Sequence, residues 1–484
     1  MSVFSELLRD YVKRSGNTIL NFSKLCGIER SLVQKYLSGS RIPANAKNIY
    51  YMAEVLQLSP KERNELVKSY YEASVGVEVY EQRTLIHNLI RYFRNYVQKG
   101  HSPLIRMQDY SDEQTDEIIL LKDGLKNWER ILWMLENEIE EEEVEITLVA
   151  QPEQEMLMSL ISYILGHRNV KVHHIVCLEN RIDQLKGSPN LKILFQLLPN
   201  LFRTDRYRVS MYYDNLNSHR NDMSILPNIM LTNHSVVCFD NYLQSGILYH
   251  KQEVRDYYQG VVDYIKKECH LEYHVASVGQ DISSEYVDVP LHLTTIHHDL
   301  CMMALVTREE VEQFKNPEFP NIDEIVDMFW NLQCYWRAYQ NQGYVNNIIT
   351  RRGMDHFVQE GKTDEIPDEF YIPIPIETRI VILKRLVEMI ENGSYMLCIT
   401  REGVFDIDDT LTIELYDGSV VKLVYQNERE RKILKISELS IVRAIEDYIR
   451  YIPESRWMMT QEETLQYVKQ SIVWLEQRVN KRDT

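Results

Sequence analysis

The stretch that decides the fold of the N-terminal region is NFSKLCGIERSLVQKYLSGSRIP, Asn21–Pro43. Thr18, just before it, is a good N-cap for a short helix that ends before Gly27. Gly27 then supplies a turn of the kind that needs a positive φ. A second helix fits Glu29–Ser38, and Gly39 is placed to end it. The stretch therefore predicts two short helices joined by a tight turn.

The second helix carries polar side chains that can face outward. A helix of this width fits the major groove of DNA, where such side chains can donate to base edges or phosphates. The outward positions are Arg30, Ser31, Gln34 and Lys35. Further helices are predicted downstream, in AKNIYYMAEVLQLS and in SPKERNELVKSYYE, the latter with Ser59 as cap and Pro60 at its first position.

The segment Thr18–Leu66 resembles the helix-turn-helix of the Cro/lambda-repressor-like (XRE) family of bacterial and phage regulators. The matching features are the short first helix, Gly27-Ile28, the second helix, Gly39-Ser40-Arg41 with Pro43, and the segment MAEVLQLSPKE. The match covers about 50 of the 484 residues. The sequence departs from the family at Ile19, where the family often has a glutamine that supports the recognition helix.

The resemblance implies a set of DNA-binding residues. Bases would be read by Arg30, Ser31, Gln34 and Lys35, and phosphates would be bound by Thr18, Arg41 and Lys47. Regulators of this type commonly bind two-fold sites as homodimers. Helical modules of this kind also occur as protein-interaction domains, so a scaffold that does not bind DNA is an alternative.

Charge is distributed unevenly along the chain. Residues 1–75 hold eleven Lys/Arg and seven Asp/Glu, a balance of +4, whereas the other 409 residues hold 43 and 65, a balance of −22. An acidic bulk repels a polyanion, so nucleic-acid contact is expected only at the N-terminal end.

The rest of the chain predicts an α/β body, so the fold class is a multi-domain chain with an all-α N-terminal domain followed by an α/β (α+β) body. The expected domains are a helix-turn-helix domain at 1–75, a helical linker or dimerisation segment at 76–114, an α/β regulatory domain at 115–304, a helical connector at 305–350 and a C-terminal α+β domain at 351–484. Strands are expected in VEITLVA, VKVHHIVCLE, YRVSMYYD, HSVVCFD and SGILYH, because these runs are β-branched or aromatic and bounded by turn residues.

Two pairs of landmarks indicate that the body contains two related halves. Val254–Ile265 and Val442–Ile452 are similar amphipathic segments that each follow strand-like runs. A helix ending in Glu-Asn also precedes a strand in each half. The spacing of these landmarks differs greatly, so coincidence between amphipathic helices is the alternative.

The sequence offers weak candidates for a metal site. His270, Glu272 and His274 in ECHLEYH would share one face of a strand, and His297, His298 and Asp299 follow in TTIHHDL. Neither spacing is a recognised ligand motif, so no metal and no cofactor is predicted. Of the adjacent pair His173 and His174, one is expected to be hydrogen-bonded in the core and the other exposed.

No catalytic motif is found, and an enzyme is not the first hypothesis. EGKT at 360–363 lacks the earlier glycine of a phosphate-binding loop, since His356 occupies that position. YHKQEVRDYY resembles the His-Lys-Asp motif of phospholipase D-like enzymes only superficially, because His250 and Lys251 are adjacent. A related fold without that activity is the remaining reading of that segment.

Dispersed single cysteines and the lack of a long apolar run favour a cytoplasmic protein. The sequence thus predicts a DNA-binding transcription regulator whose acidic body dimerises and senses a small-molecule, peptide or protein effector. The alternatives are a metal-dependent or ligand-binding sensor or enzyme with an autoregulatory head, and the interaction scaffold.

Overall fold

The structure is a computed structural model of the 484-residue chain. It describes residues 2–98, 117–141, 143–180, 189–216, 226–277, 292–302, 305–327, 329–330, 344–363, 366–416, 418–427 and 430–482. The chain divides into two compact units, here called the head and the body. The head contains the residues up to Ile86, and the body contains the described residues from His87 onward.

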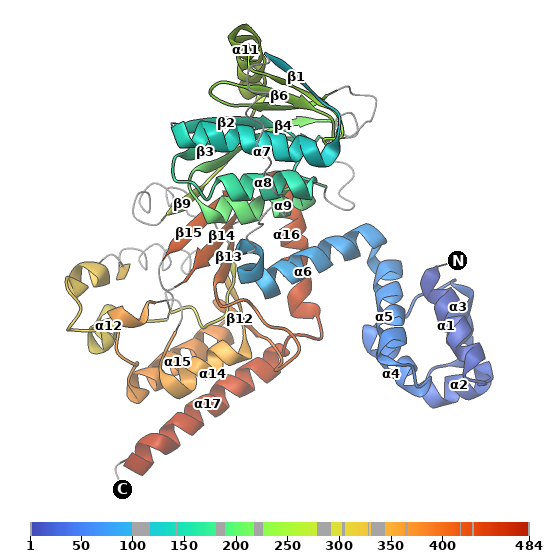
Figure 1. Cartoon of the computed structure of the whole chain (residues 1–484). Helices are drawn as coiled ribbons and strands as arrows, with labels where there is room; N and C mark the ends of the chain where they lie inside the picture. The colour runs from blue at the N-terminus through green and yellow to red at the C-terminus, as the bar shows by residue number, and fades with distance from the viewer. Residues whose placement is uncertain are drawn as a thin grey trace. The chain divides into compact units, whose positions relative to one another are not determined.

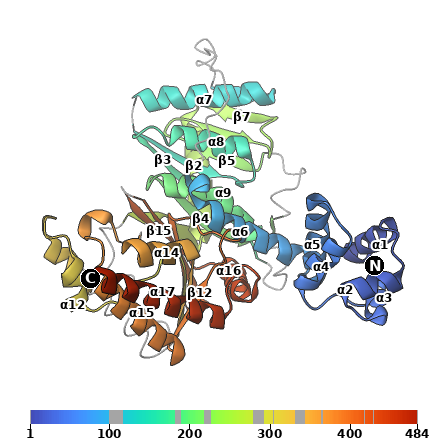
Figure 2. The same ribbon diagram turned by 90° about the horizontal axis from the view of Figure 1, so that it is seen from below.

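The head is a cluster of helices around one apolar core (Figure 2). Its helices are α1 (Val3–Arg14), α2 (Ile19–Cys26), α3 (Arg30–Ser38), α4 (Ala46–Val55) and α5 (Pro60–Val75). Phe4, Leu8, Phe22, Val33 and Met52 are fully buried in this core.

The predicted helix ends in the head are confirmed. The Thr18 side chain accepts a hydrogen bond from the Asn21 amide at 3.2 Å, which satisfies one free donor at the start of α2. Gly27 and Gly39 end α2 and α3 with φ of +63° and +74°, a region that residues with a Cβ seldom adopt. Ser59 caps α5 through a capping box with Glu62.

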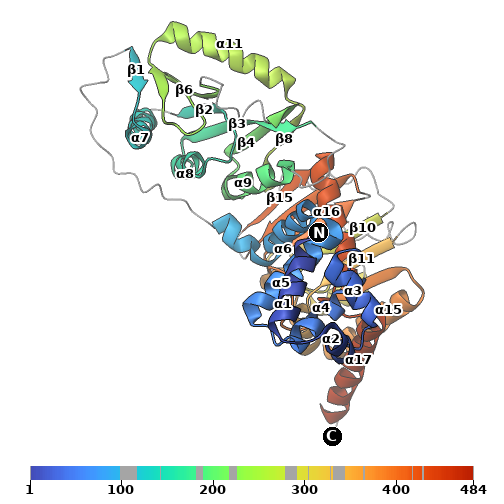
Figure 3. The ribbon, with the colours of Figure 1, turned by 90° about the vertical axis from the view of Figure 1, so that its right-hand side faces the viewer.

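The first half of the body is an α/β layer structure built on an eight-stranded sheet, with strand order β1-β7-β6-β5-β2-β3-β4-β8. The strands are β1 (Ile118–Leu121), β2 (Val144–Val149), β3 (Val170–Glu179), β4 (Tyr207–Asp214), β5 (Asn228–Leu231), β6 (Val236–Phe239), β7 (Gly246–Tyr249) and β8 (Leu271–Tyr273). Helices α7 (Gly124–Glu141), α8 (Glu155–Ile164) and α9 (Pro189–Arg203) lie on one face, and α11 (Gln252–Glu268) lies on the other (Figures 1 and 3).

The second half of the body has a seven-stranded sheet in the order β12-β11-β10-β13-β14-β15-β9. Its strands are β9 (Val275–Ser277), β10 (His292–Ile296), β11 (Tyr344–Ile349), β12 (Tyr395–Ile399), β13 (Leu411–Tyr416), β14 (Val420–Gln426) and β15 (Arg431–Ile436). Its helical segments are α12 (Arg308–Phe314), α14 (Arg351–Glu360), η2 (Asp368–Phe370), α15 (Ile376–Glu391), α16 (Leu439–Tyr451), η3 (Ile452–Glu454) and α17 (Gln461–Arg482).

The two sheets have the same topology. In each, three parallel strands (β2-β3-β4 and β10-β11-β12) join an antiparallel series (β5-β6-β7 and β13-β14-β15), and an early strand, β1 or β9, pairs with the last member of that series. The register agrees as well, as central positions illustrate: Leu148 lies opposite His174 and Met230, and Thr295 lies opposite Asn347 and Glu414.

The shared topology shows which sequence landmarks were informative. The segment at 254–265 falls in α11, and the segment at 442–452 falls in α16 apart from its last residue; α11 follows β7 and α16 follows β15, the last members of the two antiparallel series. The Glu-Asn landmark is not equivalent in the two halves, because α7 precedes β2 whereas α15 precedes β12. That second landmark was therefore misleading.

The positions of three strands also disagree with the expected domain boundaries. Tyr344–Ile349, within the segment expected to be a helical connector, is the central strand β11 of the parallel trio. β9 and β10 precede residue 304 but belong to the second sheet. Because polar Asn346 and Asn347 are at its centre, this parallel strand lacks the continuous apolar run by which buried strands are recognised.

The two halves meet through neighbouring strands and a few polar contacts. β8 ends the first sheet and β9 begins at the edge of the second, with His274 alone between them. Lys432 on β15, 8% exposed, donates through Nζ to the carbonyls of Phe202 and Arg203 at the end of α9, at 2.8 and 3.4 Å. Within the described part of the chain, no helix combines the length and the apolar character that a bilayer span requires.

Candidate functional sites in the head and in the body

The predicted DNA-binding residues are all exposed in the head. They are Thr18, Arg30, Ser31, Gln34, Lys35, Arg41 and Lys47. Thr18 caps α2, the next four lie along α3, Arg41 follows α3, and Lys47 lies in the first turn of α4. The Arg41 amide donates to the Lys35 carbonyl at 3.3 Å, which ties Arg41 to the end of α3. α2 packs against both α3 and α4.

Some basic side chains of the head are engaged by neighbouring groups. Arg9 donates to the Leu37 carbonyl at 2.6 Å, and Arg14 pairs with Glu62 at 2.5 Å. Hydrogen bonds from Ser59, followed by the Arg14 guanidinium, lower the pKa of Glu62 to about 2.

The basic residues predicted to read phosphates and bases are not engaged in this way. Arg30, Lys35, Arg41 and Lys47 have no carboxylate within ion-pair distance among the residues that the structure describes. Their charge is therefore not neutralised locally, and an anion can be accommodated beside them.

The strand histidines are not gathered into a metal site. His270, Glu272 and His274 are exposed; Glu272 is the central residue of β8, the two histidines flank this short strand, and Glu272 lies 4.0 Å from Arg208. Across the described ranges, no group of three His, Cys, Asp or Glu side chains has the geometry to hold a metal ion.

His297, His298 and Asp299, by contrast, are buried at the end of β10. Asp299 is 2% exposed and lies between two imidazoles, with His298 Nδ1 at 2.7 Å and His356 Nδ1 at 3.8 Å. The loop is pressed against α14 at Gly353, where an added Cβ would lie 2.2 Å from the His298 carbonyl oxygen.

A row of buried polar groups crosses the second sheet. Thr295 on β10 and His297 beyond its end both hydrogen-bond to Asn347 Oδ1 on β11, and the Asn347 amide donates to the Tyr395 hydroxyl on β12. Asn347 is fully buried and Tyr395 is 2% exposed. Buried polar groups are costly unless hydrogen-bonded, and here each of these four finds a partner.

The first sheet has a shorter version of this row in the same register. His174, the counterpart of Asn347, shares a 2.7 Å hydrogen bond with the hydroxyl of Tyr207, the counterpart of Tyr395. His174 Nε2 meets the Ala150 carbonyl at 2.9 Å, and burial lowers the pKa of His174 to about 4. This confirms that one histidine of the pair is bonded in the core. The other, His173, is half-buried rather than exposed and bonds to Ser210.

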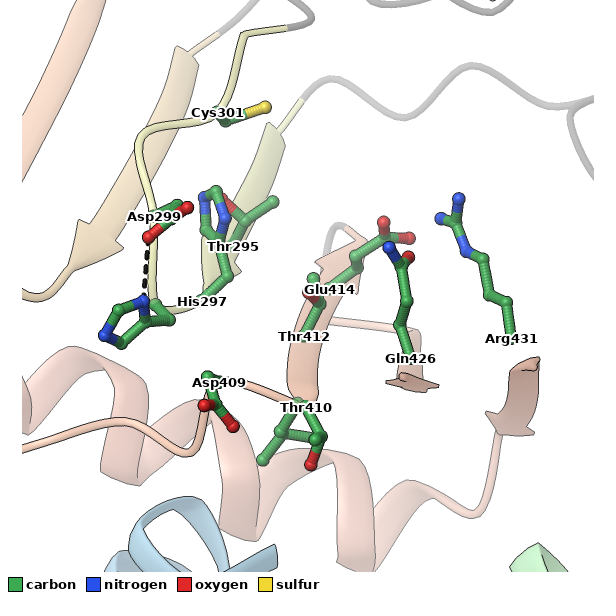
Figure 4. Close-up of a pocket in the computed structure, with 12 residues that line it drawn as sticks. Thr295, His297, Asp299, Cys301, Asp409, Thr410, Thr412, Glu414, Gln426 and Arg431 are labelled. Carbon is green, nitrogen blue, oxygen red and sulfur yellow. Dashed lines mark hydrogen bonds and ion pairs between the residues drawn. The ribbon is translucent and has the colours of Figure 1, made fainter. Parts of the chain in front are cut away.

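The halves differ where the row reaches the middle of the sheet. Leu148 and Met230 of the first half are replaced by Thr295 and Glu414 in the second. These polar replacements line a small pocket of about 60 Å³, enough for a few water molecules. Thr412 and Glu414 on β13, Gln426 on β14 and Arg431 on β15 line it across neighbouring strands (Figure 4).

Sequence reasoning missed most of this pocket. Its residues come from segments more than 100 positions apart, and no spacing connects Thr295 with Gln426 or Arg431. The only usable signal was the weak internal similarity, since aligning the two halves would have revealed Glu414 at a position that is apolar in the first half.

Comparisons with known proteins add little to this description. No protein-family model and no curated protein sequence matches the chain. Among solved structures, similar chains include a phosphatidylserine synthase of Haemophilus influenzae Rd KW20 (TM-score 0.24, 13% identity, 81% of this chain and 98% of that one). Others are TrmBL2, described as an archaeal chromatin protein (0.22, 12%, 44% and 72%), and the polyphosphate kinase of Porphyromonas gingivalis (0.22, 11%, 77% and 59%). At such TM-scores these likenesses carry no argument.

Proposed function

We propose that the protein is a sequence-specific DNA-binding transcription regulator of the XRE type, which reads DNA through α3 and acts as a cytoplasmic homodimer without enzymatic activity. The observation that supports this most is the group of exposed cations on and beside α3. Arg30, Lys35 and Arg41 lie close together in sequence on and just after one exposed helix, and none has a carboxylate partner within the described ranges.

The charge of the chain favours this reading. The first 75 residues are positive overall, and the remainder carries a balance of −22. Association with DNA gains from the release of condensed cations, and an acidic body reduces such binding elsewhere on the molecule. A two-fold dimer would present two heads to a palindromic site.

The test is selection of DNA by the full-length protein. Purified protein is incubated with fragmented genomic DNA from its source organism, and the retained fragments are sequenced. We expect a small set of palindromic sites, lost in the Arg30→Ala/Lys35→Ala double variant.

A matched control removes the same charge from α5. Lys61 and Arg63 are exposed and also lack a carboxylate partner among the described residues, so Lys61→Ala/Arg63→Ala changes the net charge equally away from α3. The control should retain the sites. If both double variants lose the sites equally, binding depends only on net charge and not on α3. If the wild type enriches no DNA, the head is a protein-interaction module instead.

A further inference from the structure

A helix that belongs to both units is broken at a defined point. α6 (Val77–Gln98) has non-helical dihedral angles at Tyr92, with φ −131° and ψ 29°. An uninterrupted helix would bond the Arg94 amide to the Ile90 carbonyl. Instead the Ile90 carbonyl accepts from the Asp408 amide, and the Arg94 amide donates to Asp408 Oδ2, both at 2.9 Å. Asp408 thus replaces one bond of the helical ladder, which accounts for the kink.

The kinked part of α6 is firmly attached to the body. Ile90 and Phe93 are fully buried, and Phe93 packs against Phe202 and Tyr425 with ring centroids 5.3 and 6.1 Å away. His87 Nδ1 lies 2.9 Å from the Tyr448 hydroxyl. Residues of the body therefore hold α6 on both sides of the kink.

A large polar pocket adjoins this attachment. Its volume is about 770 Å³, within the range of roughly 300–1,000 Å³ typical of small-molecule sites. α6 contributes Arg94 and Gln98 to its wall, and β14 contributes Tyr425. Asp409, which follows the kink-forming Asp408, also lines the pocket and pairs with Arg94. Asp409, Thr410 and Gln426 also line the small pocket of the polar row.

The pocket wall carries charges of both signs as close pairs. Arg94 lies 2.5 Å from Asp409, and Lys362 lies 2.6 Å from Asp368. Both pairs are partly exposed, so a charge that loses its partner stays solvated. A zwitterion nevertheless complements both members of a pair at once, whereas a singly charged ligand complements only one.

We propose that this pocket is an effector site for a small zwitterion of the amino-acid class. The carboxylate of the ligand binds Arg94, and its ammonium group binds Asp409. Because the ligand separates this pair beside Asp408, binding alters the kink of α6, the helix that continues into the head. The link to DNA binding rests on the proposed function, whereas binding and the effect on the kink do not.

The first experiment measures binding to the full-length protein by isothermal titration calorimetry, in the absence of DNA, with the twenty amino acids as probes. We expect at least one to bind, and its deaminated and decarboxylated analogues to bind at least tenfold more weakly. Arg94→Gln and Asp409→Asn should each weaken binding at least tenfold. Arg401→Gln is the control, because Arg401 forms a pair with Glu463 of the same length and similar exposure outside the pocket.

The second experiment follows amide hydrogen exchange of residues 90–98 with and without the amino acid that binds. We expect exchange at these positions to change at least tenfold, and exchange in α17 to remain unchanged. The proposal is overturned if none of the amino acids binds, if Arg94→Gln and Asp409→Asn bind as the wild type does, or if exchange in α6 is insensitive to the ligand. A ligand that meets both tests but leaves DNA affinity unchanged would contradict the regulatory proposal and leave the binding site intact.

Discussion

Two different polar residues occupy equivalent buried positions in the two sheets. His174 and Asn347 each lie fully buried in the second parallel strand and bond to a tyrosine hydroxyl of the third. An amide does not titrate, whereas a buried imidazole must stay neutral. The first half should therefore be sensitive to acid at a position where the second half is not.

Replacing His174 with asparagine should flatten the pH profile of stability. The folded pKa of about 4 lies below the ordinary value of 6.5, so the unfolded chain takes up a proton first as the pH falls. The neutral His174 therefore contributes to the free energy of unfolding in full above pH 6.5. This contribution is lost progressively as the pH falls toward 4, and the total loss is about 3 kcal/mol. His174→Asn should be less stable at pH 7.5, since it loses the bond to Ala150, but should lose less stability on acidification.

Urea unfolding at pH 7.5, 6 and 5 measures this difference. Burial also lowers the pKa of His87 to about 4, so part of the acid sensitivity will remain in the variant. If the free energy of unfolding falls by the same amount in wild type and His174→Asn between pH 7.5 and 5, the titration of His174 does not contribute to the acid sensitivity of the protein.

Gly353 should tolerate no side chain. A methyl group there would meet the His298 carbonyl and the Asp299 carboxylate at 2.2 and 2.6 Å. Gly353→Ala is expected to lower the free energy of unfolding by about 1–3 kcal/mol through overpacking. Gly260 in α11 has open space at the same point, so Gly260→Ala should raise stability by about 0.5–1 kcal/mol, as in an ordinary helix. Thermal unfolding of both variants checks the contrast, and a stabilised Gly353→Ala would refute the close packing.

At the scale of elements, helix ends are the features that sequence reasoning predicted best. Thr18, Gly27, Gly39 and Ser59 act locally, through their own dihedral angles and nearest amides, so their roles can be recognised without a fold. Strand order has no such local signature. β11 was expected to be helical, and Glu414 gains its place beside Thr295 only through pairing of strands more than 100 residues apart.

The contact between β15 and the end of α9 gives a prediction for an element. Lys432 supplies a cation to carbonyls at a helix C-terminus, where the helix dipole favours positive charge. Lys432→Met should lower the free energy of unfolding by about 1–3 kcal/mol, because buried carbonyls lose their donor. Lys435→Met, at an exposed position of the same strand, should change it by less than about 0.5 kcal/mol. Urea denaturation measures the free energy of unfolding of the two variants. Equal decreases would show that the loss of a positive charge, and not the bonds to the α9 carbonyls, causes the effect.

At the scale of the whole molecule, the head and the body have separate cores and opposite charge balance. Removing the body should strengthen non-specific DNA binding, because its negative field opposes the approach of a polyanion. A fragment of residues 1–86 should bind a random-sequence duplex at least about threefold more tightly than the full chain at low salt, and the difference should shrink as screening increases.

Fluorescence anisotropy at 20 and 300 mM salt, with folding of the fragment verified by circular dichroism, tests this expectation. A folded fragment that binds random DNA no better than the full chain at 20 mM salt would show that the acidic body does not discourage DNA binding.

The shared topology of the two sheets has a consequence for how the halves can differ. An assembly of two identical subunits carries every substitution twice, so a change in one copy is always imposed on the other. Two halves within one chain, joined close to His274, are free of that constraint. Leu148 and Met230 make the centre of the first sheet apolar, whereas Thr295 and Glu414 line the small pocket of the second. One half can therefore carry a polar pocket at a position where the other half is apolar.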